Sequence, residues 1–98
     1  MLTEIEIDHA LALAIGWREE QMDLMDGRKL FVDDGQKWGV FSHKSPLVIW
    51  PIAERFDCFP RLLCGLWAAG YGKRYAESDN PATAVALAVI AAHGKAMP

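Results

Sequence analysis

Two stretches of the chain repeat apolar residues every three or four positions, a spacing typical of helices with a buried face. The first, about residues 4–15, follows Thr3, and Glu6 three residues later completes the signature of a capping box. The second, residues 81–93, follows Asn80 and a proline and is apolar on nearly all sides. A glycine follows each stretch, which favours termination there. We predict a helix at each end of the chain, the last one buried on more than one face.

Residues 20–42 carry a different pattern, in which short apolar runs are separated by turn residues. Asp26-Gly27 is a strong hairpin signal, and a second glycine-containing turn follows about eight residues later. The last run, residues 37–42, has Trp38 on one face of the expected strand. The pattern predicts an antiparallel meander of three short strands.

The middle of the chain predicts one more helix and a second hairpin. A serine before Pro46 is typical of a helix start, and the apolar residues continue to about Phe56. Pro51 costs ~3 kcal/mol inside a helix, so the helix is either kinked there or irregular before that point. Glycines and aromatic residues then favour strands at about 59–64 and 66–76.

These elements follow the order α-β-β-β-α-β-β-α and form one domain, residues 1–98. We predict the α+β class, with helices packed on a largely antiparallel sheet in a small sandwich. The expected core is Leu11, Ile15, Trp50, Ile52, Phe56, Trp67, Val85, Ala88 and Val89.

Composition and charge fit a globular domain and exclude a disordered one, since the 98 residues are 52% hydrophobic and 23% charged. The net charge of −3 gives no general attraction to nucleic acid or to an anionic membrane. Residues 1–57 carry 11 acids and 6 bases, whereas residues 58–98 carry 2 acids and 4 bases. The two ends therefore offer surfaces of opposite sign, to each other, to partners or simply to solvent.

The sequence also bears on the compartment. No apolar run reaches the ~20 residues that span a bilayer, and the first residues are acidic where a secretory signal would be basic. We expect a cytoplasmic protein without a membrane partner. Cys58 and Cys64 fit no zinc pattern, and we expect both to be free core thiols rather than a disulfide.

Several local signals follow one another in an order that is itself informative. They are IDHALALAIGW with its Gly16-Trp17 end, FSHKSPLVIWPIAERF with Trp50, a strand with Trp67, and Asn80-Pro81 before the last helix. In this order the chain resembles the phage ABA-sandwich domain family and the related Nin-region protein X family, small phage and prophage proteins. Pro51 and the run FDCFPRLLC have no counterpart in that pattern. The resemblance implies an origin and a fold, and it implies no activity.

Residue types that enzymes use do not form a specific catalytic pattern. The stretch 65–73, GLWAAGYGK, lacks the lysine and the hydroxyl residue of a phosphate loop. His9, His43 and His93 have no metal-binding spacing, and we expect them to be solvated or capping. Cys58 follows an aspartate whose charge raises a thiol pKa, which opposes a hydrolase built on this cysteine. We predict a protein that is not an enzyme and has no cofactor or metal.

One stretch interleaves aromatic and basic residues in a way that also occurs in nucleic-acid-binding sheets. On a continuous strand Trp67, Tyr71, Lys73 and Tyr75 share one face, with Arg74 opposite. The simpler interpretation is that the rings pack under helices while the basic groups reach water, and the overall acidity favours it.

We therefore predict a phage or prophage accessory protein that acts by binding a host protein. Sequestration of a small ligand such as a nucleotide, or single-stranded nucleic acid binding through residues 67–75, is the alternative. The aromatic content also predicts a homodimer, because a small domain has little interior for four tryptophans. The candidate partner or ligand surface is Trp17, Trp38, Trp67, Tyr71, Lys73 and Arg74.

Overall fold

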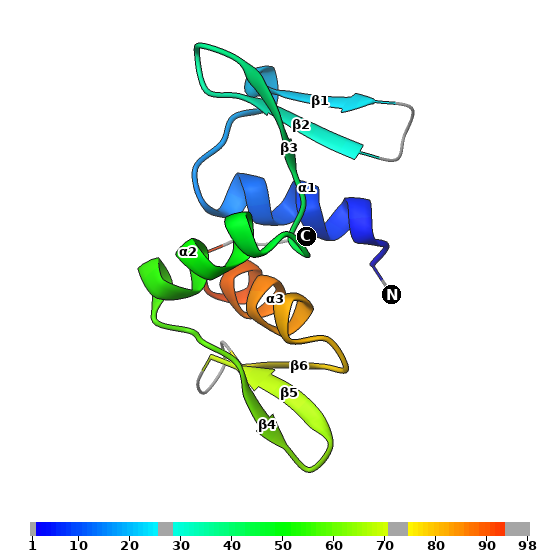
Figure 1. The fold of residues 1–98 in the computed structure, drawn as a ribbon, viewed down its shortest axis with the longest axis vertical. Coiled ribbons are helices and arrows are strands. Elements are labelled where there is room, and N and C mark those ends of the chain that lie inside the picture. The colour runs from blue at the N-terminus through cyan, green and yellow to red at the C-terminus, as the bar shows by residue number, and fades with distance from the viewer. Residues whose placement is uncertain (1, 26–28, 71–74, 94–98) are drawn as a thin grey trace.

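Three helices form the middle layer of the molecule, and a small antiparallel sheet lies on either side of them (Figure 1). The computed structural model describes residues 2–25, 29–70 and 75–93. The helices are α1 (Glu4–Ala14), α2 (Pro46–Phe56) and α3 (Pro81–His93). The first sheet holds β1 (Met22–Met25), β2 (Lys29–Asp33) and β3 (Trp38–Phe41), and the second holds β4 (Arg61–Leu63), β5 (Leu66–Ala69) and β6 (Ala76–Ser78). The predicted α+β class is confirmed, with two sheets of three strands in place of one.

Local signals at the first helix are confirmed. The Thr3 hydroxyl accepts a hydrogen bond from the Glu6 backbone N–H at 3.3 Å, and the Glu6 carboxylate accepts one from the Thr3 N–H at 2.9 Å. This capping box starts α1 with the buried side chains of Ile7 and Leu11 facing the centre of the molecule. A short 3₁₀ helix, η1 (Glu19–Gln21), then leads into β1.

The first sheet is the predicted meander, and its pairing separates an inner from an outer face. Leu30 pairs with Phe41 and both are buried, so this face lies toward the helices. The neighbouring pair, Phe31 with Val40, belongs to the opposite face. In the turn before β3, the Asp34 carboxylate accepts backbone hydrogen bonds that close the loop.

The middle helix continues through its internal proline. α2 runs from Pro46 to Phe56 with Pro51 on its exposed side, so the backbone group left without a partner faces water. Asp57 ends the helix in the left-handed conformation, with φ of 52°. The predicted helix over this stretch is therefore confirmed.

The second sheet corrects the predicted hairpin. β4 and β5 pair in register around a tight turn, as expected, but β5 ends at Ala69. A further strand, β6, begins at Ala76 and pairs with β5. The stretch 66–76 is thus divided between two strands, because Gly70 takes a positive φ of 80° that ends the extended run.

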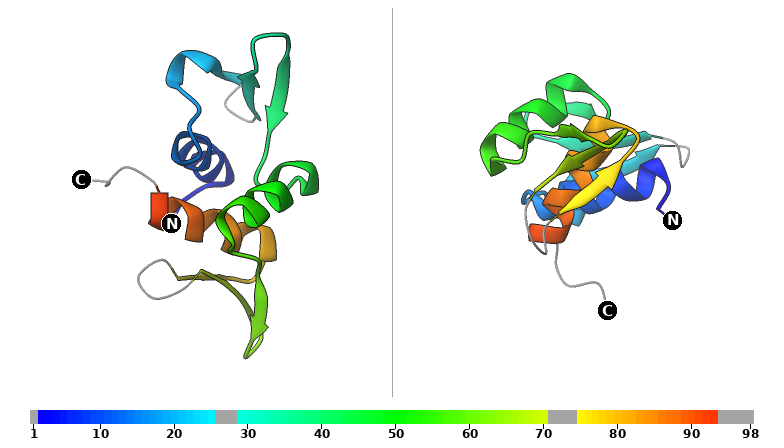
Figure 2. Two further views of the ribbon diagram at one scale, coloured as in Figure 1. Left: turned by 90° about the vertical axis from the view of Figure 1, so that its left-hand side faces the viewer. Right: turned by 90° about the horizontal axis from the view of Figure 1, so that it is seen from below.

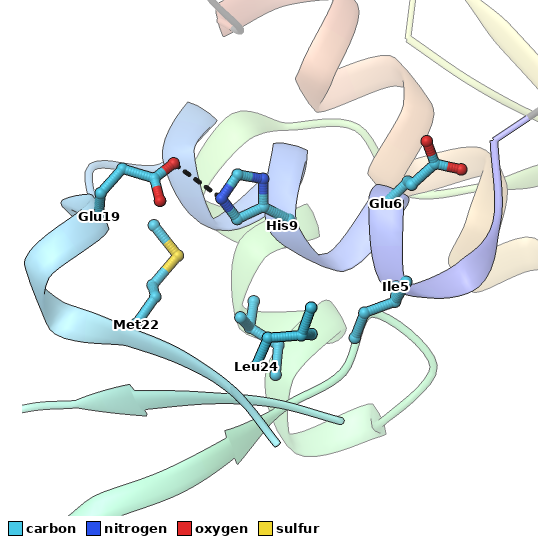
Figure 3. Close-up of a pocket in the computed structure, with 7 residues that line it drawn as sticks. Ile5, Glu6, His9, Glu19, Met22 and Leu24 are labelled. Atoms are coloured by element: carbon cyan, nitrogen blue, oxygen red, sulfur yellow. Dashed lines mark ion pairs between the residues drawn. The ribbon is translucent and has the colours of Figure 1, made fainter. Parts of the chain in front are cut away.

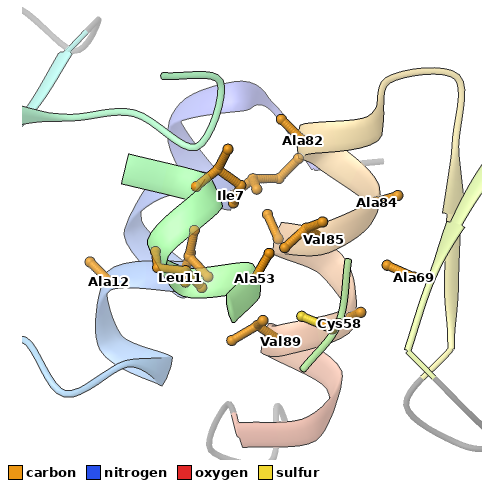
Figure 4. Close-up of a cluster of buried hydrophobic side chains, with 14 of the residues drawn as sticks. Ile7, Leu11, Ala12, Ala53, Cys58, Ala69, Ala82, Ala84, Val85 and Val89 are labelled. Carbon is orange, nitrogen blue, oxygen red and sulfur yellow. The ribbon is translucent and has the colours of Figure 1, made fainter. Parts of the chain in front are cut away.

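The core lies between α1, α2 and α3 and continues to the inner side of the second sheet (Figure 4). α3 contacts α1, α2, β5 and β6, which confirms that it is buried on more than one side. Five of the nine predicted core residues are buried: Leu11, Ile52, Val85, Ala88 and Val89. The other four, Ile15, Trp50, Phe56 and Trp67, are partly buried against this cluster.

The layered arrangement makes the molecule elongated. Its principal extents are 41 × 27 × 26 Å, and the left-hand view of Figure 2 shows the sheets at the two ends of the long axis. None of the described helices has the length and apolar character needed to cross a membrane.

Candidate functional site

The three tryptophans of the predicted binding surface have different environments. Trp38 is 50% exposed at the start of β3. Trp17 and Trp67 are partly buried and pack against the hydrophobic core. Trp38 lies on the first sheet and Trp67 on the second, at opposite ends of the molecule, so the structure does not bring them together (Figure 1).

The remaining predicted site residues, Tyr71, Lys73 and Arg74, lie outside the described residues. The aromatic and basic face that we predicted needs one continuous strand from residue 67 to 75. Because β5 ends at Ala69, the regular alternation that put these side chains on one face does not extend that far.

A small apolar patch lies on the outer face of the first sheet. Trp38 and Val40 are about half exposed, and Phe31 beside Val40 is partly buried. Trp38 pairs across the strands with Asp33, and Phe31 pairs with Asp23, so carboxylates border the patch. This patch surrounds Trp38, which is the one exposed tryptophan among the three that we predicted for the binding surface.

A larger group of exposed apolar side chains lies at the other end of the molecule, on the hairpin of β4 and β5. We call residues 59–66 the apolar hairpin. Leu62 is 59% exposed, and Phe59, Leu63 and Leu66 are also exposed. The turn between the strands is Cys64-Gly65, with positive φ at both residues (51° and 84°), the backbone of a type I′ hairpin turn.

The apolar hairpin also contains the edge strand of the described second sheet. In the order β4-β5-β6, β4 pairs with β5 on one side and with no described strand on the other. Leu62 and Leu63 are adjacent in β4 and therefore belong to opposite faces of the sheet. The one charged residue of this segment, Arg61, donates a hydrogen bond to the Gly70 carbonyl at 3.1 Å and lies near the Tyr75 ring.

A groove of about 340 Å³ lies between α1 and the inner face of the first sheet (Figure 3). Its apolar walls come from Ile5 of α1, Met22 and Leu24 of β1, and Leu30 of β2. Its polar lining consists of Glu6, His9 and Glu19. Local sequence patterns do not reveal this groove, since its walls come from a helix and a sheet that are brought together only by the fold.

A second cavity, of about 360 Å³, lies where the ends of α2 and α3 approach the second sheet. Cys58 and His93 both line it, and the ring of His93 packs on Phe56 with centroids 4.6 Å apart. Burial raises the pKa of the Cys58 thiol, and the charge of Asp57 raises it further. This environment disfavours the thiolate that a nucleophilic cysteine needs. Cys58 is a free buried thiol as predicted, whereas Cys64 is exposed and not a core residue.

Among the described residues, one buried polar cluster was missed entirely. His43 is 1% exposed, which corrects the prediction of a solvated or capping histidine. Its ring Nδ1–H donates to Asp8 Oδ1 at 2.6 Å, its backbone N–H donates to the same oxygen at 2.7 Å, and Nε2 lies 3.1 Å from Thr83 Oγ1. The polar groups thereby satisfy one another inside the protein. The available signal was Asp8, which is three residues before buried Leu11 and so on the apolar side of α1.

The carboxylate, imidazole and hydroxyl of this cluster have the connectivity of a hydrolase triad. Neither of the two cavities is lined by Asp8, His43 or Thr83, so neither gives a substrate access to the hydroxyl. The cluster joins α1, the turn after β3 and the first turn of α3, which is a structural role.

Comparison of the chain with protein-family models, with curated proteins and with solved structures found no match. The resemblance to the phage families therefore stays a prediction from the order of sequence signals.

Proposed function

We propose that the protein is a phage or prophage accessory protein without enzymatic activity, which binds a host protein through the apolar hairpin. The observation that carries this proposal is the clustering of exposed Phe59, Leu62, Leu63 and Leu66 on one projecting hairpin. Exposed apolar side chains grouped on one surface element are typical of protein-interaction sites, because covering them removes apolar area from water. The phage origin rests on the sequence resemblance alone.

The partner's chemistry follows from the strand edge and from the lack of charge. β4 is the edge strand of the second sheet among the described strands, and its leucines lie on both faces. An extended apolar segment of a host protein fits such an edge, where main-chain hydrogen bonds provide affinity and side chains on alternate faces provide specificity. Since Arg61 is the one charged residue between positions 58 and 70, we expect this association to depend little on salt.

Two features support a binding role over catalysis. The raised pKa of the Cys58 thiol keeps it protonated at neutral pH, which removes the best candidate nucleophile. The Asp8, His43 and Thr83 cluster borders neither cavity. A nucleotide, the small ligand that we considered from the sequence, is disfavoured in the groove by the carboxylates of Glu6 and Glu19.

Self-association is the competing use of the same edge, because a second copy of β4 also presents leucines on both faces. The two uses give different masses in solution. If the edge is kept for a host protein, light scattering of the free protein at tens of micromolar gives 10.9 kDa, the mass of one chain, whereas the homodimer predicted from the aromatic content gives twice that mass. A mass twice as large would assign the edge to a homodimer and overturn the host-protein assignment.

The host-protein interaction is tested by substituting two exposed leucines, one on the apolar hairpin and one outside it. Leu62→Asp places a charge on the apolar hairpin, whereas Leu47→Asp makes the same change at a 90% exposed position of α2. A host protein captured by the immobilised wild-type chain is purified and its direct binding measured. We expect Leu62→Asp to weaken it at least about tenfold and Leu47→Asp to leave it unchanged.

Leu63→Ser, on the other face of β4, is the second variant, and circular dichroism checks that each variant folds. Equal binding by the wild type and both hairpin variants would contradict the proposal, as would the absence of any saturable host partner.

A further inference from the structure

We propose that the groove between α1 and the first sheet is a separate binding site for a small amine with an apolar body. This site is independent of the host-protein interaction, because it lies at the opposite end of the molecule from the apolar hairpin. The inference rests on the shape of the groove, its apolar walls and the sign of its charged groups.

The apolar part of the site comes from three elements that the sequence separates. Ile5 of α1 and Leu24 of β1 line the groove with Met22 (Figure 3), and Leu30 of β2 lines it as well. Leu30 is almost fully buried, whereas Leu24 is 50% exposed, so the walls continue from the core to the surface. The volume of about 340 Å³ is at the lower end of ligand sites, roughly 300–1,000 Å³, and fits a small molecule.

The charge of the lining selects a cation. Among the described residues that line the groove, the charged side chains are the carboxylates of Glu6 and Glu19, with no lysine or arginine. The Glu19 Oε1 lies 2.7 Å from His9 Nε2, and this polar pair closes one side of the groove. The Glu6 carboxylate is turned away from Met22 and Leu24, so it adds negative potential without reaching the interior (Figure 3).

Glu19 is the group that an ammonium would contact. Its side chain is 66% exposed, and His9 is the partner of one carboxylate oxygen. The neighbouring cation, Arg18, forms its ion pair with Glu20 and not with Glu19. A ligand with its alkyl part against Leu24 and Met22 can therefore direct an ammonium to Glu19, while a carboxylate in the same place would be repelled.

The test compares three probes with the same alkyl chain: hexylammonium, hexanol and hexanoate. Binding is measured at pH 7.5 from the amide chemical shifts of Leu24 and Leu30. We expect hexylammonium to bind about threefold to fivefold more tightly than hexanol, the upper part of the range of one exposed ion pair, and hexanoate to bind more weakly than either.

A matched pair of variants assigns the preference to one carboxylate. Glu19→Gln is expected to reduce hexylammonium binding to the level of hexanol, whereas Glu54→Gln, an exposed glutamate on α2, is expected to have no effect. Equal binding of the three probes, no saturable shift at Leu24 and Leu30, or an equal effect of Glu54→Gln would overturn the proposal. Leu62→Asp is expected to bind hexylammonium normally, which separates this site from the apolar hairpin.

Discussion

At the scale of single residues, His43 connects segments that are far apart in the sequence. Asp8 lies 35 positions before it and Thr83 lies 40 positions after it, and both are hydrogen-bonded to its ring. The Asp8 carboxylate accepts two hydrogen bonds from His43, one from the ring and one from the backbone N–H. Loss of the Asp8 carboxylate therefore leaves two buried donors of His43 without an acceptor, which costs more than the hydrogen bonds themselves contribute.

This arrangement predicts the effect of removing Asp8. Asp8→Ala is expected to lower the free energy of unfolding by about 2–4 kcal/mol, because both His43 donors become unpaired inside the protein. Asp23→Ala, at an exposed position of β1, is the control and is expected to change it by less than about 0.5 kcal/mol. Urea denaturation measures both. A loss for Asp8→Ala no larger than that of the control would show that the cluster does not stabilise the fold.

The two cysteines differ in environment, and their reactivity should differ accordingly. In the folded protein at pH 7.5, we expect one fast reaction with a thiol reagent, at exposed Cys64, and a slow one at buried Cys58. Both should react at the same rate in urea.

Because the pKa of Cys58 is raised in the folded state, the unfolded thiol loses its proton first and stability falls as the pH rises above about 8.5. If Cys58→Ser does not show this decline in stability at high pH, the Cys58 thiol is the group responsible. Fast labelling of Cys58 in the folded chain would contradict its predicted burial.

At the scale of elements, the helices, the first meander and the hairpin of β4 and β5 followed from local signals, whereas strand β6 and the division into two sheets did not. The capping box at Thr3 and the proline starts of α2 and α3 act within a few residues, so the sequence predicts these bounds closely. The division of the strands into two sheets depends on which element each strand packs against. The burial of His43 and the groove beside Leu30 depend on the same distant contacts, and no pattern of neighbouring residues contains that information.

The internal proline of α2 provides a test at this scale. Pro51→Ala is expected to raise the free energy of unfolding by about 1–3 kcal/mol, because alanine restores a backbone donor at an exposed position where no packing is lost. Pro46→Ala is the matched control and should have little effect, since the first residue of a helix needs no backbone donor. Thermal denaturation measures both variants. Equal melting temperatures for the wild type and Pro51→Ala would mean that the proline is not a source of strain.

At the scale of the whole molecule, the two sheets are attached to the helices differently. The second sheet packs on α3 through both β5 and β6, whereas the first sheet meets the helical layer mainly where β2 contacts α1. The groove occupies part of the space between α1 and that first sheet. The first sheet therefore has less buried apolar contact to hold it in place.

Native-state hydrogen exchange is expected to reflect this difference. Amides of α3 should be the most protected in the molecule, with opening free energies near the free energy of global unfolding. Amides of β2 and β3 should exchange through a partial opening of lower free energy. The exchange rates of β5 serve as the comparison from the second sheet. Equal protection in β2 and α3 would indicate that the whole domain opens as one unit.

The helical layer has a further consequence for the newly made chain, because its three members come from the beginning, the middle and the end of the sequence. At synthesis rates of roughly 5–20 residues per second, α3 is completed roughly 4–16 s after α1. During that interval the apolar sides of α1 and α2 lack the helix that covers them. The hairpins can pair as soon as they are made, but the interior closes only after the last 13-residue helix has left the ribosome. A stop codon before position 81 would yield an exposed, protease-sensitive chain in place of a smaller folded domain.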